Sequence, residues 1–278
     1  MTEKVRSVSR VVPGIPASDG DGVNLLRIIG SNVVEDLDPF LLLDEFKSND
    51  SNEKGSFPDH PHRGFETVTY MLAGRGIHGD NHGNRGQIEP GAVQWMTAGR
   101  GIVHSETVEP VEGRMHGFQL WVNLPASDKM KPVRYQEFKA AEIPSIGLPG
   151  GGTAHVIAGR LGEEAAGPVK GIATDPLYWD VELPSNATFE AAIPKGYSAF
   201  VYVILGSVTI GDKRIMAQNG AILTDGSKVS LSANQDPARM LVIGGRPLRE
   251  PVARYGPFVM NTREEIVQAF ADYREGRF

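Results

Sequence analysis

The chain has 278 residues, 40% of them hydrophobic, with 28 basic and 34 acidic side chains and a formal net charge of −6 at pH 7. That length suits two domains, and the acidic balance argues against a nucleic-acid-binding protein, which needs a basic face. The sequence contains no cysteine, which excludes disulfides, thiolate metal sites and cysteine nucleophiles. We therefore expect a globular protein whose chemistry uses other side chains and that has no direct nucleic-acid partner.

The beginning of the chain shows no targeting pattern. Its first 30 residues mix charged side chains with prolines and form no apolar h-region, so we expect no signal peptide. No stretch approaches the roughly 18 uncharged apolar residues of a membrane span. The expectation is a cytoplasmic protein without a membrane partner.

Short strands are predicted along the first half. Runs of β-branched and aromatic residues recur there, bounded by Gly, Pro, Asn or Asp, which is typical of strands. In chain order they cover residues 23–29, 40–43, 66–72, 92–96 and 117–124. Residues 125–152 contain four prolines and three consecutive glycines, which favours a linker.

The second half resumes the strand pattern and ends in a helix. Its predicted strands cover 177–183, 200–205, 207–210, 221–223, 228–231 and 240–243. Thr262 and Glu265 form the pattern of a capping box, and the apolar residues after them recur at helical spacing. These apolar residues are Ile266, Ala269, Phe270 and Tyr273. We therefore predict a helix at about 262–275 that buries one face on a neighbour.

A weak internal repeat links the two halves. Residues 69–76 resemble 202–208, and residues 90–93 resemble 219–222, because each pair shares a strand, a glycine turn and a further strand. The repeat predicts an all-β chain with two related β-barrels. We place the domains at 1–137 and 138–278.

Two short motifs in the first half combine metal-ligand side chains. They are His60-Pro61-His62 and His104-Ser105-Glu106. On a strand, residues i and i+2 point to the same face, about 6.6 Å apart along the chain. An isolated His-x-His pair is weak evidence, since most such pairs arise by chance. Two pairs in one predicted barrel favour a site of three imidazoles and a carboxylate, which suits a divalent transition metal.

The segments around both motifs resemble the pirin family. Residues 57–67 and 94–106 are similar to the signatures of that family, and residues 117–124 and 249–261 are also pirin-like. Pirins belong to the cupin superfamily of small β-barrels. The resemblance implies a bicupin with a C-terminal helix that packs on the N-terminal domain. It also implies one metal site, in the N-terminal domain, with His60, His62, His104 and Glu106 as ligands.

Glu66 and Glu106 are the two candidate catalytic carboxylates. In many cupins a glutamate shortly after the His-x-His pair binds the metal, and Glu66 occupies that place. The resemblance to pirins implies instead that Glu106 is the ligand and that Glu66 lies behind the ligands, with ligation by Glu66 as the alternative. We expect one of the two to accept a proton from the substrate.

The repeat also predicts that the second barrel lacks a metal site. Sliding the two halves over each other places the ligand positions on side chains that do not match the ligand set. These are Ala192, Pro194, Ala233 and Gln235.

Other side chains of the first half receive structural interpretations. His78 and His82 are expected in an exposed loop, His116 in packing, and Arg63 in a salt bridge. The tryptophans, Trp95, Trp121 and Trp179, are expected in the core. Candidates for a pocket wall are Phe57, Phe65, Met71, Met96 and Phe118.

Three functions are compatible with this site. Four protein ligands on a six-coordinate ion leave two open positions, as in iron(II) oxygenases. The resemblance then implies a dioxygenase that opens the ring of a small aromatic flavonol such as quercetin. The alternatives are a non-catalytic, iron-dependent redox-sensing regulator that binds a protein partner, and a zinc-stabilised barrel. We expect Fe(II), with Mn, Ni, Cu or Zn as alternatives, and a monomer.

Overall fold

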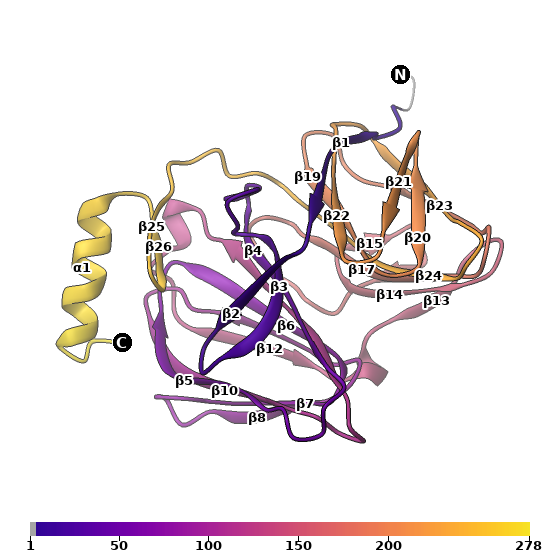
Figure 1. Ribbon diagram of the computed structural model, residues 1–278. Coiled ribbons are helices and arrows are strands. Elements are labelled where there is room, and N and C mark those ends of the chain that lie inside the picture. The colour runs from indigo at the N-terminus through magenta and orange to yellow at the C-terminus, as the bar shows by residue number, and fades with distance from the viewer. Residues whose placement is uncertain (1–3) are drawn as a thin grey trace. The chain divides into compact units, whose positions relative to one another are not determined.

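The computed structural model describes residues 4–278. The chain consists mainly of β-strands and forms two compact units. We call them the first barrel, Pro16–Ala140 with Leu248–Phe278, and the second barrel, the chain up to Ile15 with Ala141–Pro247. Each unit contains one seven-stranded and one four-stranded sheet (Figure 1). The predicted all-β architecture of two related barrels is therefore confirmed.

The first barrel places its seven-stranded sheet and its four-stranded sheet around a common interior. The larger sheet has the order β12 (Arg134–Phe138), β9 (Val93–Thr97), β6 (Phe65–Ala73), β11 (Met115–Asn123), β4 (Phe40–Ser48), β3 (Val23–Ile29), β2 (Ile15–Asp19). The smaller sheet has the order β5 (Gly55–His62), β10 (Ile102–Glu109), β7 (Arg75–Asp80), β8 (Arg85–Ile88). Both predicted ligand motifs lie in the smaller sheet, on neighbouring strands.

The second barrel repeats this strand order. Its larger sheet runs β1 (Val8–Pro13), β22 (Asn219–Leu223), β19 (Ser198–Leu205), β24 (Ala238–Gly245), β17 (Leu177–Leu183), β14 (Thr153–Ala158), β13 (Ser145–Gly147). Its smaller sheet runs β18 (Thr188–Ala192), β23 (Lys228–Ala233), β20 (Ser207–Ile210), β21 (Lys213–Met216). A short hairpin, β15 (Arg160–Leu161) and β16 (Ala165–Ala166), accompanies it.

Glycine turns at equivalent places mark the repeat. Gly74 joins β6 to β7 with φ 79°, and Gly206 joins β19 to β20 with φ 72°. A Cβ at Gly74 would lie 2.6 Å from the Glu109 carbonyl oxygen, and one at Gly206 would lie 2.3 Å from that of Pro237. Each turn therefore needs both the left-handed backbone and the missing side chain of glycine.

The two barrels exchange the ends of the chain. The N-terminal strand β1 pairs with β22 of the second barrel, and the segment after Pro247 belongs to the first barrel. The two compact units thus differ from the predicted domains 1–137 and 138–278, which are contiguous segments. The reason is that an edge strand pairs by backbone hydrogen bonds, which any sequence can supply, so the sequence pattern does not identify its partner.

The C-terminal segment adds a hairpin and a helix to the first barrel. The hairpin consists of β25 (Ala253–Tyr255) and β26 (Phe258–Met260), and α1 spans Arg263–Arg274 beside it (Figure 1). Thr262 and Glu265 form the predicted capping box, and Ile266 and Ala269 are the buried residues of the helix. They pack with Phe258 and Met260.

The first barrel holds this segment through Arg63, which follows His62 directly. Its Nη1 donates to Asp272 Oδ2 of α1 at 2.6 Å, and its guanidinium lies over the Phe278 ring. The predicted salt bridge of Arg63 is therefore confirmed.

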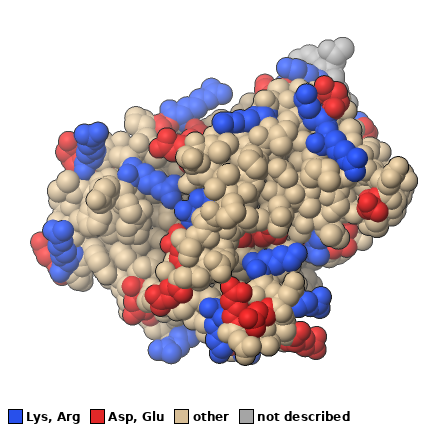
Figure 2. All heavy atoms as spheres, in the orientation of Figure 1, with Lys and Arg blue, Asp and Glu red and all other residues tan. Residues whose placement is uncertain are grey.

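Charged side chains of both signs are interspersed on the face drawn in Figure 2. The acidic excess is thus not gathered into one region of this face.

No helix in the described part of the chain is long and apolar enough to cross a membrane. The two short 3-10 helices, Ala126–Asp128 and Ala140–Glu142, lie between the strands of the barrels.

Candidate metal centre

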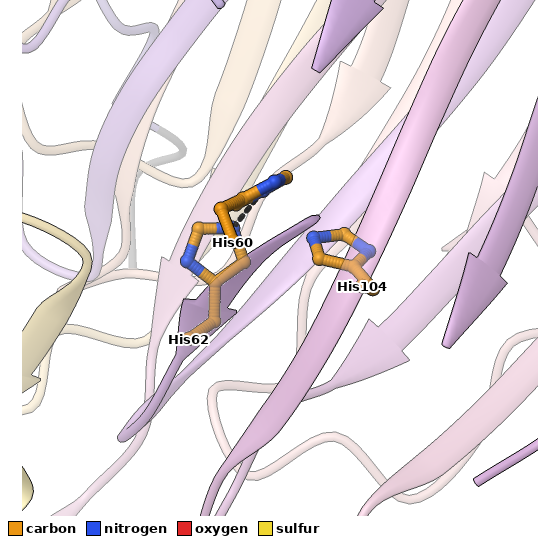
Figure 3. A group of neighbouring side chains, drawn as sticks. All are labelled: His60, His62 and His104. Carbon is orange, nitrogen blue, oxygen red and sulfur yellow. Dashed lines mark hydrogen bonds between the residues drawn. The ribbon is translucent and has the colours of Figure 1, made fainter. Parts of the chain in front are cut away.

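Three histidines converge at one end of the smaller sheet of the first barrel. His60 and His62 extend from β5, and His104 lies directly opposite His60 in the antiparallel pairing of β5 with β10. Figure 3 shows the three rings turned toward one another. One ring nitrogen of each lies within 4.8 Å of one ring nitrogen of the other two. The same-face spacing of His60 and His62, with His104 opposite them on β10, therefore produces a cluster of three imidazoles.

Hydrogen bonds orient the rings of the β5 pair. His60 Nδ1 lies 2.8 Å from the Pro58 carbonyl oxygen, and His62 Nδ1 lies 3.4 Å from that of Pro257. If each Nδ1 donates to its carbonyl, each Nε2 carries a lone pair. The two Nε2 atoms face each other at 3.1 Å (Figure 3). Two lone pairs at that distance repel each other, and a cation between them removes the repulsion.

His104 provides the third nitrogen. Both of its ring nitrogens are buried and have no hydrogen-bond partner. A buried polar atom without a partner costs about 1–3 kcal/mol, which a bound metal ion would offset.

Burial keeps the imidazoles of His62 and His104 neutral. It lowers the pKa of His62 well below its ordinary value, and the neighbouring His104 and His60 add to the effect. Burial also lowers the pKa of His104 to about 4, against the opposing influence of Glu106. Since a metal binds the neutral imidazole, both side chains are in the ligand form at neutral pH without losing a proton.

Glu106 lies near the cluster but not within it. Its carboxylate accepts a hydrogen bond from Gln119 Nε2 at 3.3 Å. Thr69 Oγ1 lies 3.3 Å from the same carboxylate and donates its proton to Gln119 Oε1 at 2.6 Å. Among the described residues, the three histidines form the only group of three or more candidate ligands whose ligand atoms all lie within 4.8 Å of one another. Glu106 lines the same cavity as His60 and His62, so its role as fourth ligand stays a prediction.

Glu66 occupies a separate, buried network. Its carboxylate accepts hydrogen bonds from Thr97 Oγ1 at 2.7 Å and Trp95 Nε1 at 3.1 Å, and Lys131 Nζ lies 3.6 Å away. Burial raises its pKa, and these donors oppose that effect. Glu66 is not among the described residues that line the cavity, which fits its expected place behind the ligands, and its role as a catalytic carboxylate stays a prediction.

The cluster opens into a cavity of about 400 Å³, a size typical of small-molecule sites. Its wall is mainly apolar and includes the predicted Phe57. Further apolar members are Leu25, Leu42, Phe46, Ile77, Ile88 and Val108. The other predicted wall candidates, Phe65, Met71, Met96 and Phe118, are fully buried core residues.

Several residues that line the cavity are not predicted from the sequence. Trp121 was expected in the core, but it lines the cavity and meets the His62 ring edge-on at 5.2 Å. Gln119 and Thr69 also line it. Gln119 and Trp121 are two residues apart in β11, so their side chains lie on the same face of the sheet. This spacing is the one sequence signal that could have identified them. Arg254 comes from β25, whose position the strand pattern did not reveal.

His78 is buried in a strand, and this corrects the exposed loop expected for it. It lies in β7 opposite Glu106 of β10, and its Nε2 is 2.9 Å from Glu137 Oε1. His82 is exposed in the following turn, as expected. His116 contacts Glu45 Oε1 at 2.7 Å, which agrees with its predicted structural role.

Strand registers identify the equivalent positions of the second barrel. When the two barrels are aligned at Gly74 and Gly206, Val229 occupies the position of His104. Ala191 pairs with Val229 as His60 pairs with His104, so Ala191 occupies the position of His60. The four positions carry Ala191, Ile193, Val229 and Leu231, all buried in one apolar core. These positions lie one to four residues before those predicted from a constant sequence offset, and they correct that prediction. None of these four side chains can ligate a metal.

Two barrels of this strand order, one with a convergent histidine cluster, define a two-domain cupin-type protein with one candidate metal centre. The family model for pirin matches residues 22–122, and the model for the pirin C-terminal cupin domain matches residues 178–278. The chain therefore belongs to the pirin family, and the bicupin fold is confirmed.

Similar proteins cover nearly the whole chain. A pirin-like protein of Caulobacter vibrioides is 50% identical over 99% of both chains. Human pirin is 46% identical over 94% of this chain and 89% of its own length. The crystal structure of a quercetin 2,3-dioxygenase from Acinetobacter baumannii superposes with a TM-score of 0.90, at 36% identity and 99% coverage of both chains.

Proposed function

We propose that this protein is a metal-dependent dioxygenase that opens the ring of a flavonol with O2, as a quercetin 2,3-dioxygenase does. One observation carries the proposal: His60 and His62 of the three-histidine cluster line a mainly apolar cavity together with the Glu106 carboxylate, and this cavity is large enough for a small aromatic molecule. The similarity to the Acinetobacter protein named quercetin 2,3-dioxygenase supports it.

The donor set fits a divalent transition metal. The facing Nε2 atoms of His60 and His62 and the unpartnered nitrogens of His104 suit an ion such as Fe(II), with Mn, Ni, Cu or Zn as alternatives. Glu106 is the fourth ligand in the proposal. When bound, the ion supplies open positions and redox chemistry for the substrate and O2.

The chain's own residues bind and orient the substrate. The side chains of Leu42, Phe46 and Ile88 remove aromatic rings from water, and Trp121 offers a flat contact beside His62. Gln119 Nε2 donates to the Glu106 carboxylate, and Thr69 Oγ1 donates to Gln119 Oε1 and so orients that amide. An oxygen of Glu106 accepts the proton of the substrate hydroxyl, which makes the substrate electron-rich.

Oxygen consumption by iron(II)-loaded protein with quercetin tests the proposal. We expect uptake by the wild type and by Glu109→Gln, since Glu109 lies on the same strand but outside the cavity lining. Glu106→Gln should lower the rate by about 100-fold or more, the usual effect of losing a general base. Protein that holds its iron but consumes no oxygen with any flavonol would refute catalysis and leave the redox-dependent binding of a protein partner to be sought by pull-down.

A further inference from the structure

An arginine lies at the edge of the cavity of the first barrel. Arg254 of β25 is an exposed residue, and it also lines the cavity. Its Cζ lies 5.0 Å from the ring centroid of Trp121, and its Nη1 donates to the Leu41 carbonyl at 3.1 Å. Trp121 in turn contacts His62. Arg254 is therefore separated from a candidate metal ligand by one aromatic ring.

The other arginine of the cavity is already neutralised. Arg27 donates to both oxygens of Asp44 at 2.9 and 2.7 Å, and to Asp19 at 2.9 Å. Arg254 has no such partner: in the described part of the chain, no carboxylate lies within 4.0 Å of its guanidinium. Glu35 and Asp36 line a neighbouring groove together with Arg254, but neither forms an ion pair with it.

Stacking leaves the in-plane N–H groups of a guanidinium available. A cation over a tryptophan face is held by the ring, and its donors point sideways. Two parallel N–H groups match the spacing of carboxylate or sulfonate oxygens. An unpaired guanidinium beside an aromatic cavity is thus prepared to receive an anionic group of a bound aromatic molecule.

We propose that Arg254 is a specificity-determining residue that binds an anionic oxygen group on the substrate. The preferred substrate is then an aromatic molecule with chelating oxygens at one end and a carboxylate or sulfonate-type group at the other. The inference rests on the proposed dioxygenase function, because it assigns the substrate class of that same cavity.

Calorimetric binding under anaerobic conditions tests this directly. The probes are 3-hydroxyflavone, its 4′-carboxylate and its 4′-sulfonate, which share the chelating unit and differ in the anionic group. The iron(II)-loaded wild type is compared with Arg254→Gln and Arg254→Lys. Arg263→Gln is the matched control, because Arg263 is exposed and lines the neighbouring groove but not the cavity.

We expect the wild type and Arg263→Gln to bind an anionic probe about 10-fold more tightly than 3-hydroxyflavone, as a charge-assisted hydrogen bond predicts. Arg254→Gln should abolish this ratio, and Arg254→Lys should keep part of it. A larger ratio for one of the two anions identifies which oxygen group the site prefers.

A wild type without the preference, or an Arg254→Gln variant that retains it, overturns the inference, and so does failure of all three probes to bind. Oxygen uptake with quercetin is measured in parallel. Uptake without the preference refutes only the role of Arg254, whereas the preference without uptake refutes only the dioxygenase.

Discussion

Glu66 and Glu106 have the same functional group in different surroundings. Glu66 is fully buried and accepts hydrogen bonds from Thr97 and Trp95, whereas Glu106 faces the cavity. We expect Glu66→Gln to lower the free energy of unfolding by about 1–3 kcal/mol, because it weakens buried hydrogen bonds, and to leave metal binding intact. Urea unfolding and metal analysis check this. Loss of the metal from folded Glu66→Gln would show that Glu66 supports the metal site.

His104 makes the stability of the metal-free protein depend on pH. Its pKa is about 4 in the folded chain, against an ordinary value of 6.5. Between these values the unfolded chain binds a proton that the folded chain does not, so stability is lost as the pH falls from 6.5 toward 4. His104 accounts for up to about 3 kcal/mol of this loss.

Urea unfolding of the metal-free protein at several pH values between 7 and about 4 measures the effect. We expect His104→Gln to lose less stability over this range than the wild type, because it removes the group that titrates. Parallel pH profiles for the two proteins would contradict the assignment.

At the scale of elements, a buried ion pair joins α1 to Arg63, the residue that follows β5. Arg63 and Asp272 are both largely buried and lie 2.6 Å apart. Arg63→Met removes this bond while Arg277 and Gln268 still contact Asp272, so we expect a loss of about 1–3 kcal/mol together with faster hydrogen exchange in α1. Arg274→Met, at the exposed end of the same helix, should change stability by less than about 0.5 kcal/mol. Equal exchange in both variants would show that α1 is held by its apolar face alone.

Strand patterns predicted most elements because they are local. The alternation that places His60 and His62 on one face is fixed by strand geometry, and the capping box of α1 is contained in four residues. Trp121 was assigned to the core because a tryptophan in a strand is usually buried, whichever face it occupies. Only the pairing of β11 with its neighbours makes its face part of a cavity wall.

Pairings between distant segments lay outside such patterns. Arg254 reaches the cavity from a segment more than a hundred residues after β11, and no local periodicity encodes that contact. The same holds for β1, whose partner is β22. The loops of the two barrels differ in length, so a constant sequence offset does not align all of their strands. For this reason Val229, and not Ala233, occupies the position of His104.

At the scale of the whole molecule, the repeat predicts one metal per chain. The second barrel fills the equivalent positions with Ala191, Ile193, Val229 and Leu231, which pack in its core. We expect elemental analysis to give one ion per chain, and none for His60→Ala combined with His104→Ala. A residual full equivalent of metal in that double variant would place a site elsewhere.

The exchanged N-terminal segment makes the second barrel depend on residues far from it in sequence. Arg6 is almost fully buried, and its guanidinium donates to the carbonyl oxygens of Pro194, Tyr197 and Thr224 at 2.7–3.1 Å. Arg6→Ala leaves these acceptors unpaired, so we expect a loss of about 2–4 kcal/mol. Arg10, exposed on β1, provides the matched control, and Arg10→Ala should cost less than about 0.5 kcal/mol.

Hydrogen exchange locates the effect. We expect Arg6→Ala to speed exchange in β19 and β22 of the second barrel and to leave β5 and β10 protected, with the metal still bound, because the ligands belong to the other unit. Simultaneous loss of protection in both sets of strands would mean that the two barrels unfold as one cooperative unit. In that case the metal would stabilise the second barrel as well, although that barrel carries none of the ligands.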